Sequence, residues 1–169
     1  MGNNNYAYLM VEYDTPPLIK EIQKQLNTED LFVKDGKYGI EQCTHTTIVP
    51  CLDNNISIEE LKPYIYPLNK YGAVLTDISK FDFDDHDVLK CSCASDTIYN
   101  TNKKITSVYP SHSEFSSEYK PHVTIAYVKK GICEKFMKDM LSPLIVLKPK
   151  CFCFSHYDNN GNEVEERFT

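Results

Sequence analysis

Two short segments of the chain repeat each other, and both have the composition of β-strands. They are His45-Thr46-Thr47-Ile48 and His122-Val123-Thr124-Ile125, which share the pattern H-x-T-I and start 77 residues apart (122 − 45). Side chains alternate along a strand, so each histidine and the threonine two positions later point to the same face. The alternate positions, which include Ile48 and Ile125, suit a core on the other face. Each strand therefore offers an imidazole and a hydroxyl side by side, away from the core.

If these two strands meet in space, they carry the groups needed to cleave a phosphodiester. One imidazole can take the proton from an attacking hydroxyl while the other gives a proton to the leaving oxygen. Imidazole has an unperturbed pKa of about 6.5, so both protonation states are present near neutral pH. The threonine hydroxyls can donate hydrogen bonds to phosphate oxygens, and the scheme needs no metal ion or cofactor. The alternative is that both motifs are ordinary polar strand surface, since His and Thr are common there.

The remaining sequence predicts an α+β fold with antiparallel strands and about three helices. Strands are expected where β-branched and aromatic residues gather, and helices where apolar residues recur at helical spacing after a Pro or a capping box. The expected strands are residues 6–13, 43–49 (limited by Pro50), 71–83, 88–94, 122–128, 145–155 and 163–168. The expected helices are 17–26, 57–66 and 132–141, and residues 95–118 are expected to form a long irregular connection.

Charge and cysteine content limit the partners that we expect. The net charge is −6, and Arg167 is the only arginine among 18 basic residues. Long nucleic acid is disfavoured because binding it requires a basic surface, whereas a small anionic ligand is not excluded. No apolar run approaches the length of a membrane span, and seven cysteines without a secretory signal are typical of reduced thiols. We therefore expect a cytoplasmic protein that needs no membrane and no obligate protein partner.

The two H-x-T motifs, one in each half of a chain of this length, resemble those of the 2H phosphoesterase superfamily. This superfamily includes RNA 2′,3′-cyclic phosphodiesterases, 2′-5′ RNA ligase-like proteins, viral enzymes that cleave 2′,5′-oligoadenylate, and phage anti-CBASS nucleases. The resemblance implies a bilobal α+β fold with pseudo-two-fold symmetry, in which two antiparallel sheets flank a central cleft. The lobes would be about residues 1–69 and 70–169. It also implies that His45 and His122 are the acid/base pair and that Thr47 and Thr124 contact the phosphate.

Within the superfamily, the chain is most similar to the phage anti-CBASS nucleases in size and motif placement. They also have an aromatic residue at the end of the first strand, here Tyr13, which could stack on a base. The resemblance then implies cleavage of 3′-5′ bonds in cyclic di- and trinucleotide immune signals. A ribose 2′-hydroxyl would attack the adjacent 3′-phosphodiester and leave a 2′,3′-cyclic phosphate, which is open to hydrolysis. The alternative substrates are RNA 2′,3′-cyclic phosphates and 2′-5′ oligoadenylates, and the sequence does not say which histidine is the base.

Two further hypotheses stay open. The chain could be a sponge that sequesters a cyclic nucleotide without cleaving it. Alternatively, it could be a zinc-stapled interaction domain in which the pairs Cys91/Cys93 and Cys151/Cys153 bind zinc, if their strands are neighbours. The acidic segment between Asp82 and Asp87 is expected to be a solvated turn. The secondary candidates for substrate contact are Tyr119, Lys120, His156 and Tyr157.

Overall fold

The computed structural model describes residues 6–70, 72–114 and 118–169, which form an α+β fold of two larger antiparallel sheets, a small hairpin and three helices. One sheet has the strand order β11-β10-β1-β4, and the other has the order β6-β7-β5-β9 with β8 paired to β7. The helices are α1 (Pro17–Gln25), α2 (Ile58–Ile65) and α3 (Asp96–Val108). The strands are β1 (Tyr6–Tyr13), β2 (Val33–Lys34), β3 (Lys37–Tyr38), β4 (His45–Asp53), β5 (Ala73–Leu75), β6 (Ser79–Asp82), β7 (Asp87–Ala94), β8 (His122–Val128), β9 (Ile145–Leu147), β10 (Pro149–Tyr157) and β11 (Glu163–Phe168).

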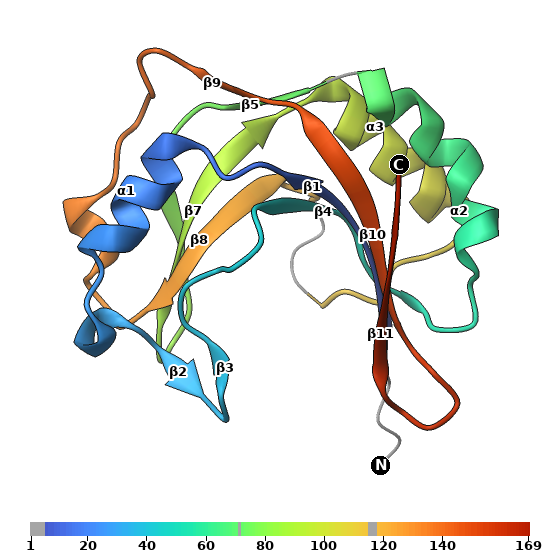
Figure 1. Cartoon of the computed structure of the whole chain (residues 1–169), viewed down its shortest axis with the longest axis horizontal. Coiled ribbons are helices and arrows are strands. Elements are labelled where there is room, and N and C mark those ends of the chain that lie inside the picture. Colours follow the sequence, from blue (N-terminus) through green and yellow to red (C-terminus); the bar gives the residue numbers. More distant parts are fainter. Residues whose placement is uncertain (1–5, 71, 115–117) are drawn as a thin grey trace.

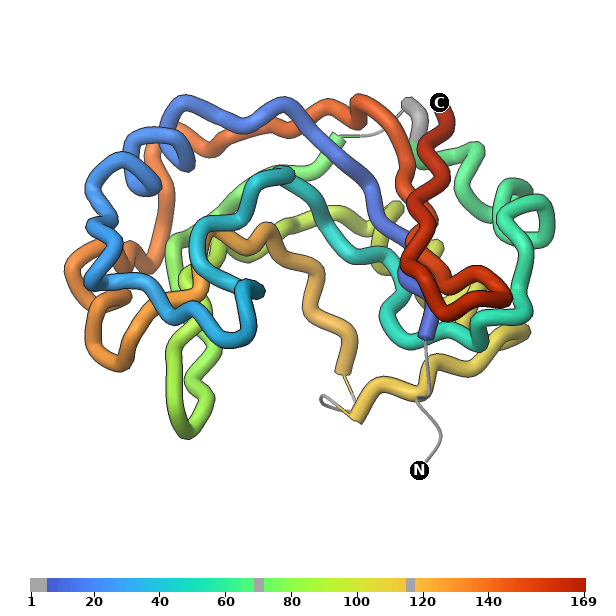
Figure 2. Tube along the Cα trace, turned by 60° about the horizontal axis from the view of Figure 1, so that its bottom comes forward, coloured from blue at the N-terminus to red at the C-terminus, as the bar shows by residue number. Residues whose placement is uncertain are grey.

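The two large sheets lie side by side and form an arch (Figure 1). Helices α2 and α3 lie at the end of the arch that carries the four-stranded sheet, with α3 against β4, while α1 packs against β8 at the other end. Strands β4 and β8 belong to different sheets but contact each other near the middle of the arch (Figure 2). The strands that carry the two H-x-T motifs are therefore neighbours.

The core lies on one face of each sheet and follows the two-residue period of the strands. In β1, Ala7, Leu9, Val11 and Tyr13 are all buried, whereas Tyr6, Tyr8 and Met10 on the other face are partly exposed. Burying one large apolar side chain contributes roughly 1.5–3 kcal/mol, so this stripe strongly fixes which face of β1 points inward.

Several expected elements are confirmed with nearly the expected ends. Strands β1, β7, β8 and β11 and helices α1 and α2 match the sequence-based ranges. Helix α2 begins with the expected capping box, in which the Ser57 N–H donates to Glu60 Oε2 at 2.9 Å. The expected strand 145–155 is divided into β9 and β10, and the expected strand 71–83 into β5 and β6, with residue 71 outside the described residues.

The prediction that Pro50 limits the first motif's strand was wrong, because β4 continues through it to Asp53. Proline lacks the N–H that an inner strand would need for its ladder. However, β4 is at the edge of its sheet, next to β1 alone, so one side of its backbone needs no partner strand. The pairing of β1 with β4 is also irregular between Ala7 and Leu9, opposite this part of β4.

Two further secondary-structure predictions, both in the second half of the chain, were wrong. Within the expected irregular connection 95–118, residues 96–108 form helix α3 and residues 109–114 are irregular, while residues 115–117 lie outside the described residues. The signal was present: Ser95 caps the helix by accepting from the Ile98 N–H at 3.3 Å, and Ile98 and Ile105 form its buried face. Conversely, residues 132–141 contain only a 3-10 turn, because the backbone of Lys138 pairs with Ile78 instead of forming a helix.

The expected division into residues 1–69 and 70–169 does not match the sheets. The four-stranded sheet takes β1 and β4 from the first part and β10 and β11 from the second. Helix α1, from the first part, packs instead against β8. Within the described residues, no helix has both the length and the apolar composition needed to cross a membrane.

Candidate active site

The two H-x-T motifs start β4 and β8, and their side chains alternate as the sequence predicts. His45, Thr47, His122 and Thr124 are all partly exposed. The alternate residues Thr46, Ile48, Val123 and Ile125 are buried. Strands β4 and β8 contact each other, and each presents its histidine and its threonine on a partly exposed face.

Both imidazoles are held by the same hydrogen bond. His45 Nδ1 lies 2.9 Å from the carbonyl oxygen of Cys43, and His122 Nδ1 lies 2.8 Å from that of Lys120. In each case the acceptor is the residue two positions before the histidine. A carbonyl oxygen can only accept, so Nδ1 must carry the proton in both rings. Nε2 is then the position that loses or gains a proton, and neither Nε2 has a hydrogen-bond partner among the described residues.

His122 lies against the ring of Phe81 from β6. The two rings meet edge to face, with their centroids 4.8 Å apart. Burial lowers the pKa of His122, the hydrogen bond to Lys120 opposes this, and the positive charges of Lys90 and His45 lower it further. The neutral form of His122 is therefore favoured, and the electrostatic effect of His45 is consistent with the two histidines being neighbours.

The neighbour of His45 across the sheet is Glu12, its partner in the β1–β4 pairing. Burial alone would raise the pKa of Glu12, but hydrogen bonds from Arg167 and Cys151 lower it, so the carboxylate stays ionised. Arg167 Nε lies 3.1 Å from Glu12 Oε1, and a second guanidinium nitrogen lies 2.8 Å from Glu165. The single arginine of the chain is thus paired with two carboxylates and is not free to bind a phosphate.

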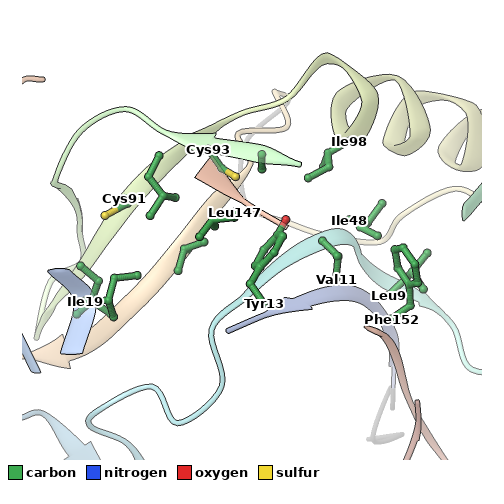
Figure 3. Close-up of a cluster of buried hydrophobic side chains, with 14 of the residues drawn as sticks. Leu9, Val11, Tyr13, Ile19, Ile48, Cys91, Cys93, Ile98, Leu147 and Phe152 are labelled. Atoms are coloured by element: carbon green, nitrogen blue, oxygen red, sulfur yellow. The ribbon is translucent and has the colours of Figure 1, made fainter. Parts of the chain in front are cut away.

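Tyr13, predicted from the sequence to stack on a substrate base, does not lie at this site. It is 4% exposed and points into the core between the two sheets, among Val11, Ile48 and Leu147 (Figure 3). A buried ring offers no face to a base, so this prediction was wrong. The strand period contained the correct answer, because Tyr13 is in phase with Leu9 and Val11.

Of the four secondary candidates, Tyr119 and Lys120 have hydrogen bonds with motif residues, whereas His156 and Tyr157 bond to other parts of the fold. The Tyr119 hydroxyl donates to the Thr47 carbonyl at 2.7 Å, which joins the two motifs, and the Lys120 carbonyl holds His122 while its own side chain is exposed. His156 stacks on Phe154 and bonds Glu166 at 2.8 Å, on the helix-covered face of the sheet. Tyr157 lies at the end of β10, where its backbone N–H donates to Asn54.

The sequence reasoning missed Lys90, Phe81 and Glu12. Strand alternation places all three beside the motif residues only once the pairing of β1 with β4, and of β7 with β6 and β8, is known. The pattern of a single strand does not identify the neighbouring strands. Lys90, within an apolar strand, therefore could not be assigned to the site from the sequence alone.

The two C-x-C pairs lie in different sheets, Cys91 and Cys93 on β7 and Cys151 and Cys153 on β10. Their strands are not neighbours, so the condition for a shared zinc site is not met. The described part of the chain contains no group of three or more His, Cys, Asp or Glu side chains placed to hold a metal ion.

Two surface hollows, of about 180 and 320 Å³, lie near α2, away from the histidines. The smaller is lined by residues such as Lys62 and Phe168, and the larger by residues such as Tyr64 and Lys104. Neither is lined by a residue of the H-x-T motifs.

The chain matches no protein-family model and no curated protein sequence. The chemistry of the site is therefore the basis for inferring its function.

Proposed function

We propose that the protein is a metal-independent phosphodiesterase of the 2H type, acting on cyclic di- or trinucleotides of the kind that signal in bacterial antiviral defence. The observation that carries this proposal is the matched pair of Nδ1 hydrogen bonds at His45 and His122. Both rings are held in one tautomer, with Nε2 as the exchanging position. That arrangement suits one base and one acid, and a protein that only sequesters a nucleotide has no need for it.

In the proposed reaction, a ribose 2′-hydroxyl attacks the phosphorus of the adjacent 3′-5′ phosphodiester. His122 takes the hydroxyl proton at Nε2, since burial favours its neutral form, and His45 donates its Nε2 proton to the leaving 5′-oxygen. The P–O5′ bond breaks, and a linear product with a 2′,3′-cyclic phosphate remains. Thr47 and Thr124 donate hydrogen bonds to the non-bridging oxygens, where negative charge builds up.

The architecture supports the same proposal. Each motif begins a strand at the junction of two antiparallel sheets, and each histidine is anchored in the same way, as expected for a bilobal fold with pseudo-two-fold symmetry. We include that 2H-like architecture in the proposal, although its lobes are not continuous in sequence.

Aromatic side chains near the second motif support a base-bearing substrate. An irregular pairing of β7 with β8 after Leu89 places Tyr127 on the same face as Thr124 and His122. Tyr38 packs edge-on against Tyr127, with a centroid distance of 4.9 Å, and is 52% exposed. In place of the buried Tyr13, Tyr38 therefore offers an accessible ring for stacking on a base.

The test is product analysis by chromatography in the presence of EDTA. The panel contains cyclic di- and trinucleotides with 3′-5′ linkages, a mixed 2′-5′/3′-5′ cyclic dinucleotide, a linear 2′-5′ oligoadenylate and a 2′,3′-cyclic mononucleotide. We expect linear products from the cyclic nucleotides, and their loss in the variants His45→Ala and His122→Ala. His112→Ala is the matched control, because His112 pairs with Asp53 at 2.9 Å and belongs to neither motif.

Full turnover by either motif variant would overturn the two-histidine mechanism. Cleavage of the 2′,3′-cyclic mononucleotide alone would replace the proposed substrate with RNA ends. Tight binding with every ligand recovered intact would show a sponge instead of an enzyme.

A further inference from the structure

A buried lysine lies beside the second motif. Lys90 is 8% exposed, in the middle of β7, and is the cross-strand partner of Thr124 on β8. Lysine is rarely buried without a carboxylate, because removing an ammonium from water is costly. The position of Lys90 therefore needs an explanation that its strand alone does not give.

The hydrogen bonds of Lys90 do not neutralise its charge. Nζ donates to Ser79 Oγ at 2.8 Å and to Ser92 Oγ at 3.3 Å, and both acceptors are uncharged hydroxyls. Among the described residues, Lys90 Nζ has these two hydroxyls as its hydrogen-bond acceptors and forms no ion pair with a carboxylate. An ammonium has three N–H donors, so one donor remains after the two serines.

The nearest negative charge is one hydrogen bond further away. Asp77 Oδ1 accepts from Ser79 Oγ and from the Ser92 N–H, each at 3.0 Å. Asp77 thereby orients the two serines that hold Lys90. Burial lowers the pKa of Lys90 and Asp77 opposes this, while the charge of the exposed Lys120 lowers it further. A ligand that places negative charge against Nζ would favour the ammonium form.

Phe81 connects Lys90 to His122. Lys90 Nζ lies 4.7 Å from the centroid of the Phe81 ring, and the His122 ring lies 4.8 Å from the same centroid. The ammonium, the imidazole and the Thr124 hydroxyl therefore gather on one face of the β6–β7–β8 sheet. Thr124 and Ser92 add hydroxyl groups on this face, whereas the Ser79 hydroxyl already donates to Asp77.

We propose that Lys90 binds the phosphate of the substrate, with its third ammonium donor directed to a non-bridging oxygen that also contacts Thr124. This inference rests on the proposed function of the site and adds a group outside the two motifs. It explains why a chain with net charge −6, whose one arginine is already paired, keeps a cation inside this sheet. Charge-assisted hydrogen bonds to phosphate are among the stronger polar contacts in proteins.

The first test measures binding without turnover, with inorganic phosphate as the probe. Phosphate is titrated into the full chain at constant ionic strength, and NMR follows the ring signals of His122 and the Hε/Cε signals of Lys90. We expect both sets to shift saturably with one dissociation constant. In Lys90→Met, which keeps the length of the side chain, binding should weaken roughly ten- to a hundredfold, the range of a lost charged hydrogen bond.

Lys129→Met is the matched control, because it removes the same charge from an exposed position just after β8. It should bind phosphate as the unmodified chain does. Unchanged binding in Lys90→Met overturns the proposal. So does the absence of any shift at Lys90 in the unmodified protein, a result that does not depend on how well the variant folds.

The second test separates this inference from the proposed activity. With a cyclic dinucleotide that is turned over, Lys90→Met should lower kcat/KM roughly ten- to a hundredfold, while His45→Ala abolishes turnover. Phosphate binding at Lys90 without turnover of any cyclic nucleotide would retain the anion site and reject the enzyme. Turnover that is unaffected by Lys90→Met would retain the enzyme and reject the role of Lys90.

Discussion

The hydroxyl of Tyr119 donates a 2.7 Å hydrogen bond to the main-chain carbonyl of Thr47, 72 residues earlier in the sequence. Tyr119 lies three residues before His122, in the segment that leads into β8, and Thr47 is the threonine of the first motif. This hydrogen bond therefore connects the segment that precedes the second motif to the backbone of the first motif. The Tyr119 ring also stacks on Tyr99 of α3, the helix that packs against β4.

Removing this bond should loosen the relative placement of the two motifs. We expect Tyr119→Phe to lower the free energy of unfolding by about 1 kcal/mol, the usual contribution of one hydrogen bond. If Tyr119 positions the motifs, kcat should fall while KM changes little, because the chemical step depends on the spacing of the histidines more than ground-state binding does. Chemical denaturation and steady-state kinetics on a cyclic dinucleotide measure the two effects. Tyr99→Phe, which removes a hydroxyl from the stacked neighbour, is the control, and an equal loss of kcat in both variants would contradict the positioning role.

The environment of His122 predicts a pH dependence. Its pKa in the folded protein is lowered by burial, whereas in the unfolded chain it is about 6.5. The unfolded state therefore binds more protons below that pH, and the free energy of unfolding should decrease as the pH falls below about 6.5. His122→Ala should remove this part of the pH dependence, as measured by urea denaturation between pH 5 and pH 8.

NMR can measure the electrostatic effect of His45 on the pKa of His122 directly. Because a positive charge on His45 lowers the pKa of His122, His45→Ala should raise the pKa of His122 toward its ordinary value. His112→Ala, outside both motifs, should leave it unchanged. A pKa for His122 that does not respond to His45→Ala would show that the two rings are too far apart to share one phosphate.

Much of the candidate site follows from the sequence because it depends on local rules. The two-residue period places His45 with Thr47 and His122 with Thr124, and this needs no knowledge of the partners of β4 or β8. The capping box at Ser57 is equally local. These features depend on residues within four positions of one another, where physical constraints are strongest.

The sequence-based predictions that were wrong concern elements whose structure depends on tertiary contacts. Residues 132–141 have a helical apolar period, but their backbone is held by Thr76 and Ile78, whose pairing the pattern does not contain. Pro50 is tolerated because β4 is an edge strand, and edge position is a property of the whole sheet. Helix α3 differs from these cases, because its cap at Ser95 and its apolar face are local features of the sequence. The many polar residues of the segment nevertheless favour an irregular connection over a helix.

The acidic turn between β6 and β7 illustrates the same limit and leads to a stability prediction. The expectation of a solvated turn is confirmed for Asp82, Asp84 and Asp85, which are exposed. It is wrong for Asp87, the first residue of β7, which is 0% exposed and accepts from Lys130 at 2.8 Å, Lys80 at 3.1 Å and the Gly131 N–H at 3.1 Å. Burial alone would raise the pKa of Asp87, and these bonds instead hold it below its usual range. Asp87→Asn should cost roughly 3 kcal/mol of unfolding free energy, because it leaves two lysines without their buried partner. Asp84→Asn, in the exposed part of the turn, should change it by less than about 0.5 kcal/mol. A loss of less than about 0.5 kcal/mol for Asp87→Asn would contradict a stabilising role for this buried carboxylate.

Tyr13 allows the clearest separation of core packing from substrate contact. Its hydroxyl is buried without a hydrogen-bond partner of good geometry among the described residues, and the neighbouring Thr46 hydroxyl donates instead to Cys93 Sγ at 3.6 Å. Tyr13→Phe should therefore leave the free energy of unfolding unchanged or raise it by about 1 kcal/mol, because an unpaired buried hydroxyl is a cost.

Tyr13→Ala should instead cost roughly 3–5 kcal/mol through the cavity that it leaves between the sheets. The Phe variant should keep the KM and kcat of the unmodified protein for any cyclic dinucleotide that it cleaves. Tyr38→Ala should raise KM with little loss of stability, because the Tyr38 ring is exposed and the Tyr13 ring is buried. A higher KM in Tyr13→Phe, with KM unchanged in Tyr38→Ala, would reverse this assignment. It would mean that the end of β1 opens when substrate binds.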